Sequence, residues 1–163
     1  PLEIEFLIGS KSFTMVIAPF KKNLEKLGIK SKIRLIDENQ YKIRINEFDY
    51  DIIVNVFAQG LIPGSEQYAY WHSSGQNIKG SRNLNGINNK AIDYLLIKIN
   101  NAKTKNDLKN YTKALDRILL WNYYNVPQWY NNSYRILYKN KFNTPKNKPK
   151  YSIGIDSWWI KRK

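Results

Sequence analysis

Residues 51–57 read Asp-Ile-Ile-Val-Asn-Val-Phe, a nearly continuous run of apolar and β-branched side chains. A strand that is buried on both faces, as in a parallel sheet covered by helices, has this composition. The run therefore predicts a strand at residues 51–57 in the interior of an α/β sheet.

The residues before this run alternate between strand and helix patterns. Apolar side chains recur at every second position in residues 2–8, and residues 29–36 form another strand-like stretch. Between them, apolar residues at helical spacing follow Ser12 and stop at Gly28. Pro19 lies inside this helix and predicts a kink or a late helix start, because proline lacks the backbone donor.

A second helix is predicted just before the 51–57 strand. Asp37 and Gln40 have the spacing of a helix N-cap and its reciprocal partner, and the helix is expected to reach about Glu47. The order strand, helix, strand, helix, strand over residues 2–57 predicts an α/β fold with a right-handed, mostly parallel sheet flanked by helices.

The rest of the chain is less regular. Residues 58–87 lack a periodic pattern apart from a short helix near residues 65–71. Two amphipathic helices follow, and Thr104 with Asp107 forms a capping box for the second. Beyond them we expect strands at residues 126–130 and 134–138, an exposed linker at 139–150, and a chain end with two adjacent tryptophans, Trp158 and Trp159.

Composition narrows the possible functions. The chain has 163 residues, of which 42% are apolar and 25% charged, so a folded domain is expected. The absence of cysteine excludes disulfides, thiolate metal sites and a cysteine nucleophile.

The first residue is Pro1 and no leader pattern precedes a cleavage site, so we expect either a processed chain or a piece of a longer protein.

The chain is strongly basic, with 27 Lys and Arg against 13 Asp and Glu and a formal charge of +14. Residues 139–163 alone hold eight basic side chains and one acid, Asp156. Biased codon usage that favours Lys, Asn and Ile explains such a composition. A site for a polyanion or a membrane surface is the alternative.

Signatures of catalysis are missing from the sequence. It contains no Gly-rich phosphate loop, no HExxH and no GxSxG. His72 is the single histidine, so a Ser-His-Asp arrangement is arithmetically possible but unsupported, and a metal site would depend on the same residue. Asp49 and Asp51 could act as a pair of catalytic carboxylates, but the simpler interpretation is that they are charged residues at the entry to a strand. We therefore predict no catalytic residue, metal or cofactor.

The irregular segment 58–87 leaves the carboxyl end of the predicted 51–57 strand, where open α/β sheets bind their ligands. It is rich in amides, hydroxyls and aromatic rings, which suit a peptide-like ligand, whereas Arg82 offers forked donors for a carboxylate or phosphate. An ion pair of Arg82 within the chain, or a loop whose rings only fill the core, are the alternatives. The predicted ligand contacts are Gln59, Trp71, Ser81, Arg82, Asn83 and, more weakly, Trp129.

Several ordered motifs carry a family resemblance. The stretch NLEKLGIKSKIRLIDENQYKIRINEFDYDIIV at residues 23–54 resembles the C-terminal lobe of oligopeptide-type (family 5) extracellular solute-binding proteins of ABC importers. The later motifs resemble the YejA-type subgroup, which is associated with peptides, microcin C and muropeptide-like compounds; they are FAQGLIPGSEQYAYWHSS, GSRNLNGINNKAIDYLL, ALDRILLWNYYNVPQWY and IDSWW.

The resemblance implies a type II periplasmic-binding-protein fold, a two-lobed clamp that captures peptides or peptide-like compounds in the periplasm without catalysis. Residues 1–144 would form most of the C-terminal lobe, and residues 145–163 would return to a missing N-terminal lobe. ABC permease subunits would be partners, and no nucleic acid is expected. Many members carry an aspartate for the ligand's amino terminus near Gln59–Gly60, where this sequence has no carboxylate.

Two alternatives come from other classes of protein. A basic nucleic-acid or anionic-surface binding domain would use the tail at residues 139–163 and would lose affinity steeply with salt. A small hydrolase would depend on His72 and is the weakest of the three hypotheses.

Overall fold

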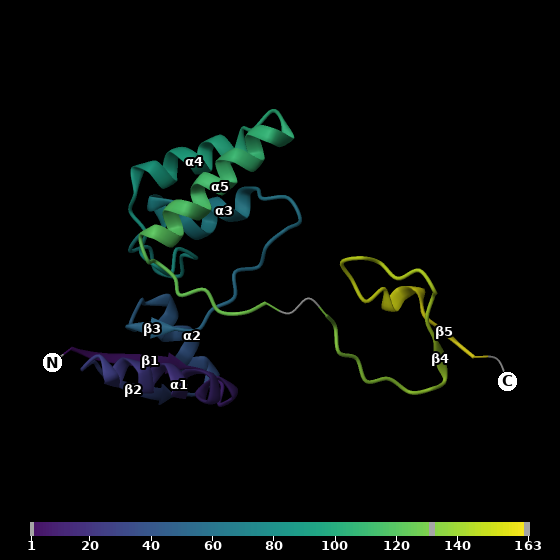
Figure 1. The fold of residues 1–163 in the computed structure, drawn as a ribbon, viewed down its shortest axis with the longest axis horizontal. Coiled ribbons are helices and arrows are strands. Elements are labelled where there is room, and N and C mark those ends of the chain that lie inside the picture. The colour runs from purple at the N-terminus through teal and green to yellow at the C-terminus, as the bar shows by residue number, and fades with distance from the viewer. Residues whose placement is uncertain (1, 131–132, 162–163) are drawn as a thin grey trace. The chain divides into compact units, whose positions relative to one another are not determined.

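The computed structural model describes residues 2–130 and 133–161 (Figure 1). The chain divides into two compact units, Pro1–Val126 and Pro127–Lys163, which we describe separately as the first and second unit. Within the described residues, no helix combines the length and the apolar character needed to cross a membrane.

The first unit contains a three-stranded parallel sheet in the order β2-β1-β3. The strands are β1 (Glu3–Ile8), β2 (Lys30–Leu35) and β3 (Ile52–Ile53). Helix α1 (Ser12–Lys26) connects β1 to β2 and packs Ile17 against Phe6 and Ile8 of β1. The predicted strand–helix–strand order is therefore confirmed. Helix α1 begins at Ser12 and includes Pro19, so the late start that Pro19 suggested is wrong.

Helix α2 (Glu38–Asn46) has the predicted N-cap residue, Asp37. The Asp37 carboxylate accepts the backbone N–H groups of Asn39 and Gln40 at 3.0 and 3.1 Å. At the other end of the helix, Arg44 donates to the Asp49 carboxylate at 2.8 Å. These local bonds fix the turn that leads the chain back to β3.

The predicted strand at residues 51–57 is shorter and less buried than its composition suggested. Only Ile52 and Ile53 pair with β1, and both are half-buried rather than enclosed on two faces. Strand β3 lies at an edge of the sheet, because β1 occupies the centre, and Val56 is exposed. Asp51 accepts the backbone N–H of Glu5 at 2.8 Å and so serves the sheet, as expected for a strand-entry residue.

The second half of the first unit is helical. It contains α3 (Ser65–Trp71), the short 3-10 helix η1 (Ser73–Gly75), α4 (Lys90–Asn100) and α5 (Lys105–Trp121). Helix α4 contacts both α3 and α5 (Figure 1), and the buried side chains between them form a core of their own. The predicted N-cap at Thr104 is confirmed, since Thr104 Oγ1 accepts the Asp107 N–H at 3.0 Å, but the Asp107 carboxylate accepts the Thr104 hydroxyl at 2.7 Å.

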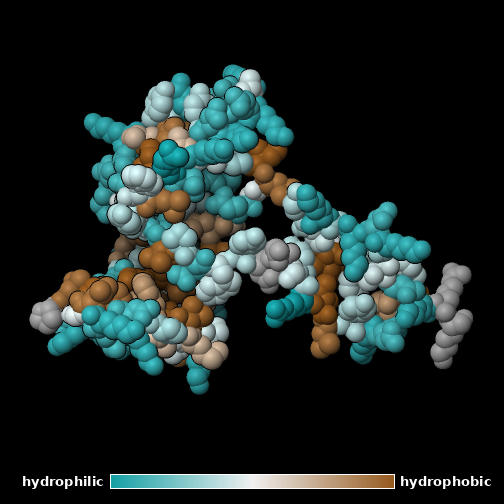
Figure 2. All heavy atoms as spheres, viewed as in Figure 1, coloured by the Kyte–Doolittle hydropathy of each residue, from teal (hydrophilic) through white to brown (hydrophobic). Residues whose placement is uncertain are grey.

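The second unit has little regular structure. It contains β4 (Phe142–Asn143), a 3-10 helix η2 (Ile155–Ser157) and β5 (Trp159–Ile160), and the two strands pair antiparallel. The strands predicted at residues 126–130 and 134–138 are wrong, because the described residues of both stretches form no strand pairing. Figure 2 shows an apolar band among the hydrophilic side chains of this unit.

Candidate functional site

A hollow of about 300 Å³ lies where the chain leaves β3. One wall is the segment that follows β3, and the opposite wall is the loop that precedes α4. Tyr70 of α3 and the last turn of α2 complete the lining, which comprises Ile45, Asn46, Asn55, Val56, Phe57, Ala58, Tyr70, Gly80, Ser81, Arg82 and Leu84. The hollow therefore lies beside the segment that leaves β3, whereas the carboxyl end of β1 at Ile8, Gly9 and Ser10 lines a different hollow, together with the first turns of α1 and α2.

Arg82 supplies the charge of this hollow. Its guanidinium carbon lies 5.4 Å from the centre of the Tyr70 ring, an arrangement typical of a cation–π contact. The Tyr70 hydroxyl in turn donates to the Ala58 carbonyl at 2.9 Å and holds the ring in place. Within the described residues Arg82 makes no ion pair, so the alternative of an internal partner for this cation is not supported. Arg82 presents forked donors for an anionic group.

Ser81 lies beside Arg82 in a closely packed loop. Its hydroxyl oxygen accepts the backbone N–H of Asn83 at 3.0 Å. A Cβ added to Gly75 would come within 2.6 Å of Ser81 Oγ, so only glycine fits at position 75. The loop thus packs closely against η1, and the Ser81 hydroxyl acts as an acceptor within the loop.

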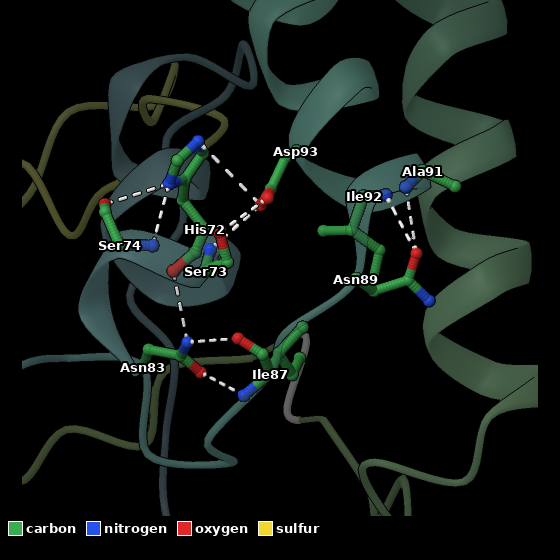
Figure 3. A network of polar contacts seen from close by, with 9 residues as sticks. All are labelled: His72, Ser73, Ser74, Asn83, Ile87, Asn89, Ala91, Ile92 and Asp93. Atoms are coloured by element: carbon green, nitrogen blue, oxygen red, sulfur yellow. Dashed lines mark hydrogen bonds and ion pairs between the residues drawn. The ribbon is translucent and has the colours of Figure 1, made fainter. Parts of the chain in front are cut away.

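Two predicted contacts, Asn83 and Trp71, lie in the interior instead. Asn83 is 0% exposed and donates from Nδ2 to the carbonyls of His72 and Ile87, at 3.1 and 2.9 Å, while its Oδ1 accepts the Ile87 N–H (Figure 3). Trp71 is 5% exposed and packs 4.6 Å from the Phe57 ring centre. These side chains shape the site rather than line it, as in the alternative interpretation of the loop.

Gln59 is exposed and is linked to a carboxylate that the sequence analysis did not select. The buried Gln67 donates from Nε2 to Gln59 Oε1 and, at 3.4 Å, to Glu66 Oε1, while its Oε1 accepts the Trp71 indole N–H at 3.0 Å. Glu66 therefore lies on the same amide network as Gln59. The signal for it was available, because Glu66 is the only acid in residues 58–87.

The Glu66 carboxylate is held in its ionised form. Burial alone would raise the pKa of Glu66, but hydrogen bonds from its own amide, from the Gly64 amide at 3.0 Å and from Gln67 lower the pKa below its ordinary value. The network around Gln59 therefore offers a fixed negative charge.

His72 occupies a structural network. Its Nδ1 accepts the Ser74 backbone N–H at 3.0 Å and lies 2.8 Å from Ser74 Oγ, while Nε2 lies 3.8 Å from Asp93 Oδ1 (Figure 3). Asp93 also accepts the N–H and the hydroxyl of Ser73 at 2.8 and 2.6 Å. Because a backbone N–H engages the Nδ1 lone pair, that nitrogen is not free to take the proton of the Ser74 hydroxyl, so the arrangement does not support a catalytic triad.

Trp129 belongs to the second unit and is 64% exposed. The structure thus brings two of the predicted contacts, Ser81 and Arg82, together at the hollow. Gln59 follows the lining residue Ala58 in the sequence, and the side chains of Trp71 and Asn83 are buried.

Comparison with known proteins confirms the sequence resemblance. No protein-family model matches the chain. The chain is 40% identical over 159 residues, 97% of its length, to a protein of Agrobacterium fabrum named probable peptide-binding protein YejA, of which the match covers 26%. The chain thus spans about a quarter of the length of the relatives it matches. These matched relatives carry names of binding proteins or are uncharacterized, and none is named as an enzyme.

Solved structures confirm the predicted fold class. A periplasmic oligopeptide-binding protein of Thermotoga maritima, solved with mannohexaose, superposes with a TM-score of 0.71 at 20% identity over 80% of this chain and 25% of that chain. The oligopeptide-binding protein AppA of Bacillus subtilis, solved with a nonapeptide, superposes with a TM-score of 0.69 at 18% identity over 99% of this chain and 32% of that chain. The chain therefore has the fold of a lobe of these proteins.

Proposed function

We propose that this chain is part of the substrate-binding component of an ABC importer, and that it captures oligopeptides or peptide-like compounds without altering them. The 40% identity to a protein named as peptide-binding supports the class of function. The observation that carries the ligand chemistry is Arg82, an exposed cation that makes no ion pair within the described residues and lines the hollow beyond β3.

The ligand contacts follow from the groups around the hollow. Arg82 receives a carboxylate or phosphate of the ligand through its forked donors, and the Ser81 hydroxyl donates beside it. Gln59 hydrogen-bonds to neutral groups, and Glu66 receives an ammonium group in place of the carboxylate missing at Gln59–Gly60. Neutral hydrogen bonds contribute roughly 0.5–1.5 kcal/mol and charged ones ~1.5–3 kcal/mol, so Arg82 and Glu66 dominate the affinity.

The remaining site residues have different roles in the proposal. Trp71 and Asn83 fix the shape of the loop from below. Trp129 is kept as a predicted ligand contact in the second unit.

The whole protein is proposed to be a two-lobed periplasmic clamp that delivers its ligand to ABC permease subunits. Residues 1–144 contribute most of one lobe, and residues 145–163 return to the other lobe, which lies outside this chain. The exposed Trp159 and Ile160 of β5 support this docking role, because large apolar side chains left open to water favour a partner surface. Peptide would be bound poorly by this chain alone, since closure around a ligand needs both lobes.

Calorimetry on the whole protein tests the proposal, with a library of short peptides and muropeptides as probes. Arg82→Ala is expected to weaken the affinity for the preferred ligand by roughly 10- to 100-fold. Arg117→Ala, which removes an exposed arginine of α5 outside the hollow, is the matched control and should bind as the wild type does. Absence of binding to every member of the library, or equal affinities of the Arg82→Ala and wild-type proteins, would contradict the proposal.

A further inference from the structure

The positive charge of the chain is concentrated in the second unit. Residues 127–163 hold nine Lys and Arg against one acid, whereas residues 1–126 hold 18 against 12. The described cations of the first unit include several that pair with acids, among them Lys32 and Arg44 with Glu5 at 3.2 and 3.4 Å. Among residues 127–130 and 133–161, by contrast, no ion pair occurs. The second unit therefore carries a positive charge that its own acids do not neutralise.

Most of this charge lies in residues 139–151, which we call the lysine loop. It holds five lysines and no acid within 13 residues: Lys139, Lys141, Lys146, Lys148 and Lys150. Lys141 and Lys150 each lie 5.2 Å from the centre of the next ring in the sequence, Phe142 and Tyr151, contacts that leave their charges unbalanced.

The fold adds a further cation to the lysine loop. Strand β4 within the loop pairs with β5, and the backbone N–H of Lys161 donates to the Lys141 carbonyl at 2.8 Å. The Lys161 ammonium then donates to Asn140 Oδ1 at 2.9 Å, a neutral acceptor. Gathering like charges without an acid between them is electrostatically unfavourable unless an external anion neutralises them.

Apolar side chains accompany these cations. Tyr151, at the end of the lysine loop, is 58% exposed, and Ile155 is 62% exposed. Gly154 holds Ile155 close to the loop, because a Cβ at position 154 would come within 2.9 Å of the Pro149 ring. An aromatic ring and an aliphatic side chain among lysines suit the interface of a bilayer, where rings lie at headgroup level and aliphatic groups enter the acyl region. A nucleic acid has no acyl region that Ile155 could enter.

We propose that the lysine loop, with Lys161 and Ile155, binds the surface of an anionic phospholipid membrane. Each lysine near such a surface interacts with its negative potential, and the attraction is screened within a Debye length. This surface shares no residue with the lining of the ligand hollow and needs no peptide. It uses the lysines and Ile155, whereas the docking proposed for residues 145–163 on the other lobe uses Trp159 and Ile160 of β5. It would hold the protein near the membrane in which an importer resides.

Flotation of the whole protein with vesicles tests this inference. Vesicles of phosphatidylglycerol and phosphatidylcholine should retain the protein at low salt and release it as salt rises, while pure phosphatidylcholine vesicles should not retain it. The triple variant Lys146→Gln, Lys148→Gln, Lys150→Gln should partition onto the anionic vesicles roughly 100-fold more weakly. The matched control is Lys105→Gln, Lys109→Gln, Lys113→Gln on α5, which removes the same charge from exposed positions of the first unit and should lose less than about 5-fold.

Equal losses in the two triple variants would overturn the inference, because the overall charge and not the lysine loop would then determine binding. A single-stranded oligonucleotide that binds the protein while anionic vesicles do not would also overturn it in favour of a nucleic-acid surface. Circular dichroism checks that both variants remain folded. Because no peptide is involved, failure here leaves the proposed peptide capture intact, and failure of peptide capture leaves this inference intact.

Discussion

The two units of this chain differ in how far they bury their apolar side chains. The first unit encloses two apolar cores, one around Phe6, Ile8 and Ile17 and one between α3, α4 and α5. In the second unit, Gly154 is the one buried residue among those that the structure describes, and large side chains such as Leu137 and Trp159 are exposed. The first unit thus has apolar cores of its own, whereas most apolar side chains of the second unit are left to contact partners outside the chain.

The largest expected effect comes from truncating matched leucines in the two units. Leu96 is 1% exposed between α4 and its neighbours, so Leu96→Ala should lower the free energy of unfolding by about 2–5 kcal/mol through lost packing and a residual cavity. Leu137 is fully exposed, and Leu137→Ala should change the free energy of unfolding by less than about 0.5 kcal/mol. Urea titration of the 163-residue chain measures both, and similar losses would contradict the comparison.

A smaller effect is expected from Asn83, which distinguishes a structural residue from a ligand contact. Asn83→Ala would leave the Ile87 amide and two carbonyls without their partner, at a cost of about 2–3 kcal/mol in the free energy of unfolding. Asn101→Ala, which removes an exposed bond to the Ile97 carbonyl, is the control and should cost at most about 0.5 kcal/mol. If Asn83→Ala left stability unchanged and altered only peptide affinity, the structural role would be wrong.

The smallest effect concerns Tyr50, whose hydroxyl donates to the Leu84 carbonyl at 2.7 Å. Burial, with a contribution from Tyr41, raises the pKa of Tyr50 from 10.0 to about 12. Because the folded pKa lies above the ordinary one, Tyr50 stabilises the fold fully below pH 10 and loses this contribution as the pH rises through 12. The melting-temperature advantage of the wild type over Tyr50→Phe should therefore shrink between pH 10 and 12.

Tyr123→Phe is the control for general alkaline effects, since Tyr123 is exposed. A constant difference between wild type and Tyr50→Phe over that range would show that Tyr50 does not titrate with the fold.

Local signals in the sequence predicted most of the first unit. The caps at Asp37 and Thr104 and the apolar periodicities depend on neighbouring residues, and all are found in the structure. The stretches 51–57, 126–130 and 134–138 were overestimated as strands, because a strand also needs a partner to pair with and the sequence does not show one. Strand propensity therefore predicted a paired strand correctly only where another strand of the sheet, β1 or β2, lies beside it.

Only part of the candidate site could be predicted, because the rest depends on packing between segments that are distant in the sequence. The position of the loop beyond β3 and the charge of Arg82 were visible in the sequence. Whether Trp71 and Asn83 face a ligand or the core depends on how α3 packs against α4, which residue type alone does not determine. The proximity of Glu66 to Gln59 likewise depends on the buried Gln67, which bonds to both.

The central claim, that Arg82 receives an anionic group of a peptide ligand, is tested most directly by a double-mutant cycle on the whole protein. The wild type and Arg82→Ala would each be titrated calorimetrically with one peptide carrying a free terminal carboxylate and with its amide. We predict a coupling energy of about 1.5–3 kcal/mol between Arg82 and the carboxylate. A coupling energy within about 0.5 kcal/mol of zero for tightly bound peptides would contradict the claim.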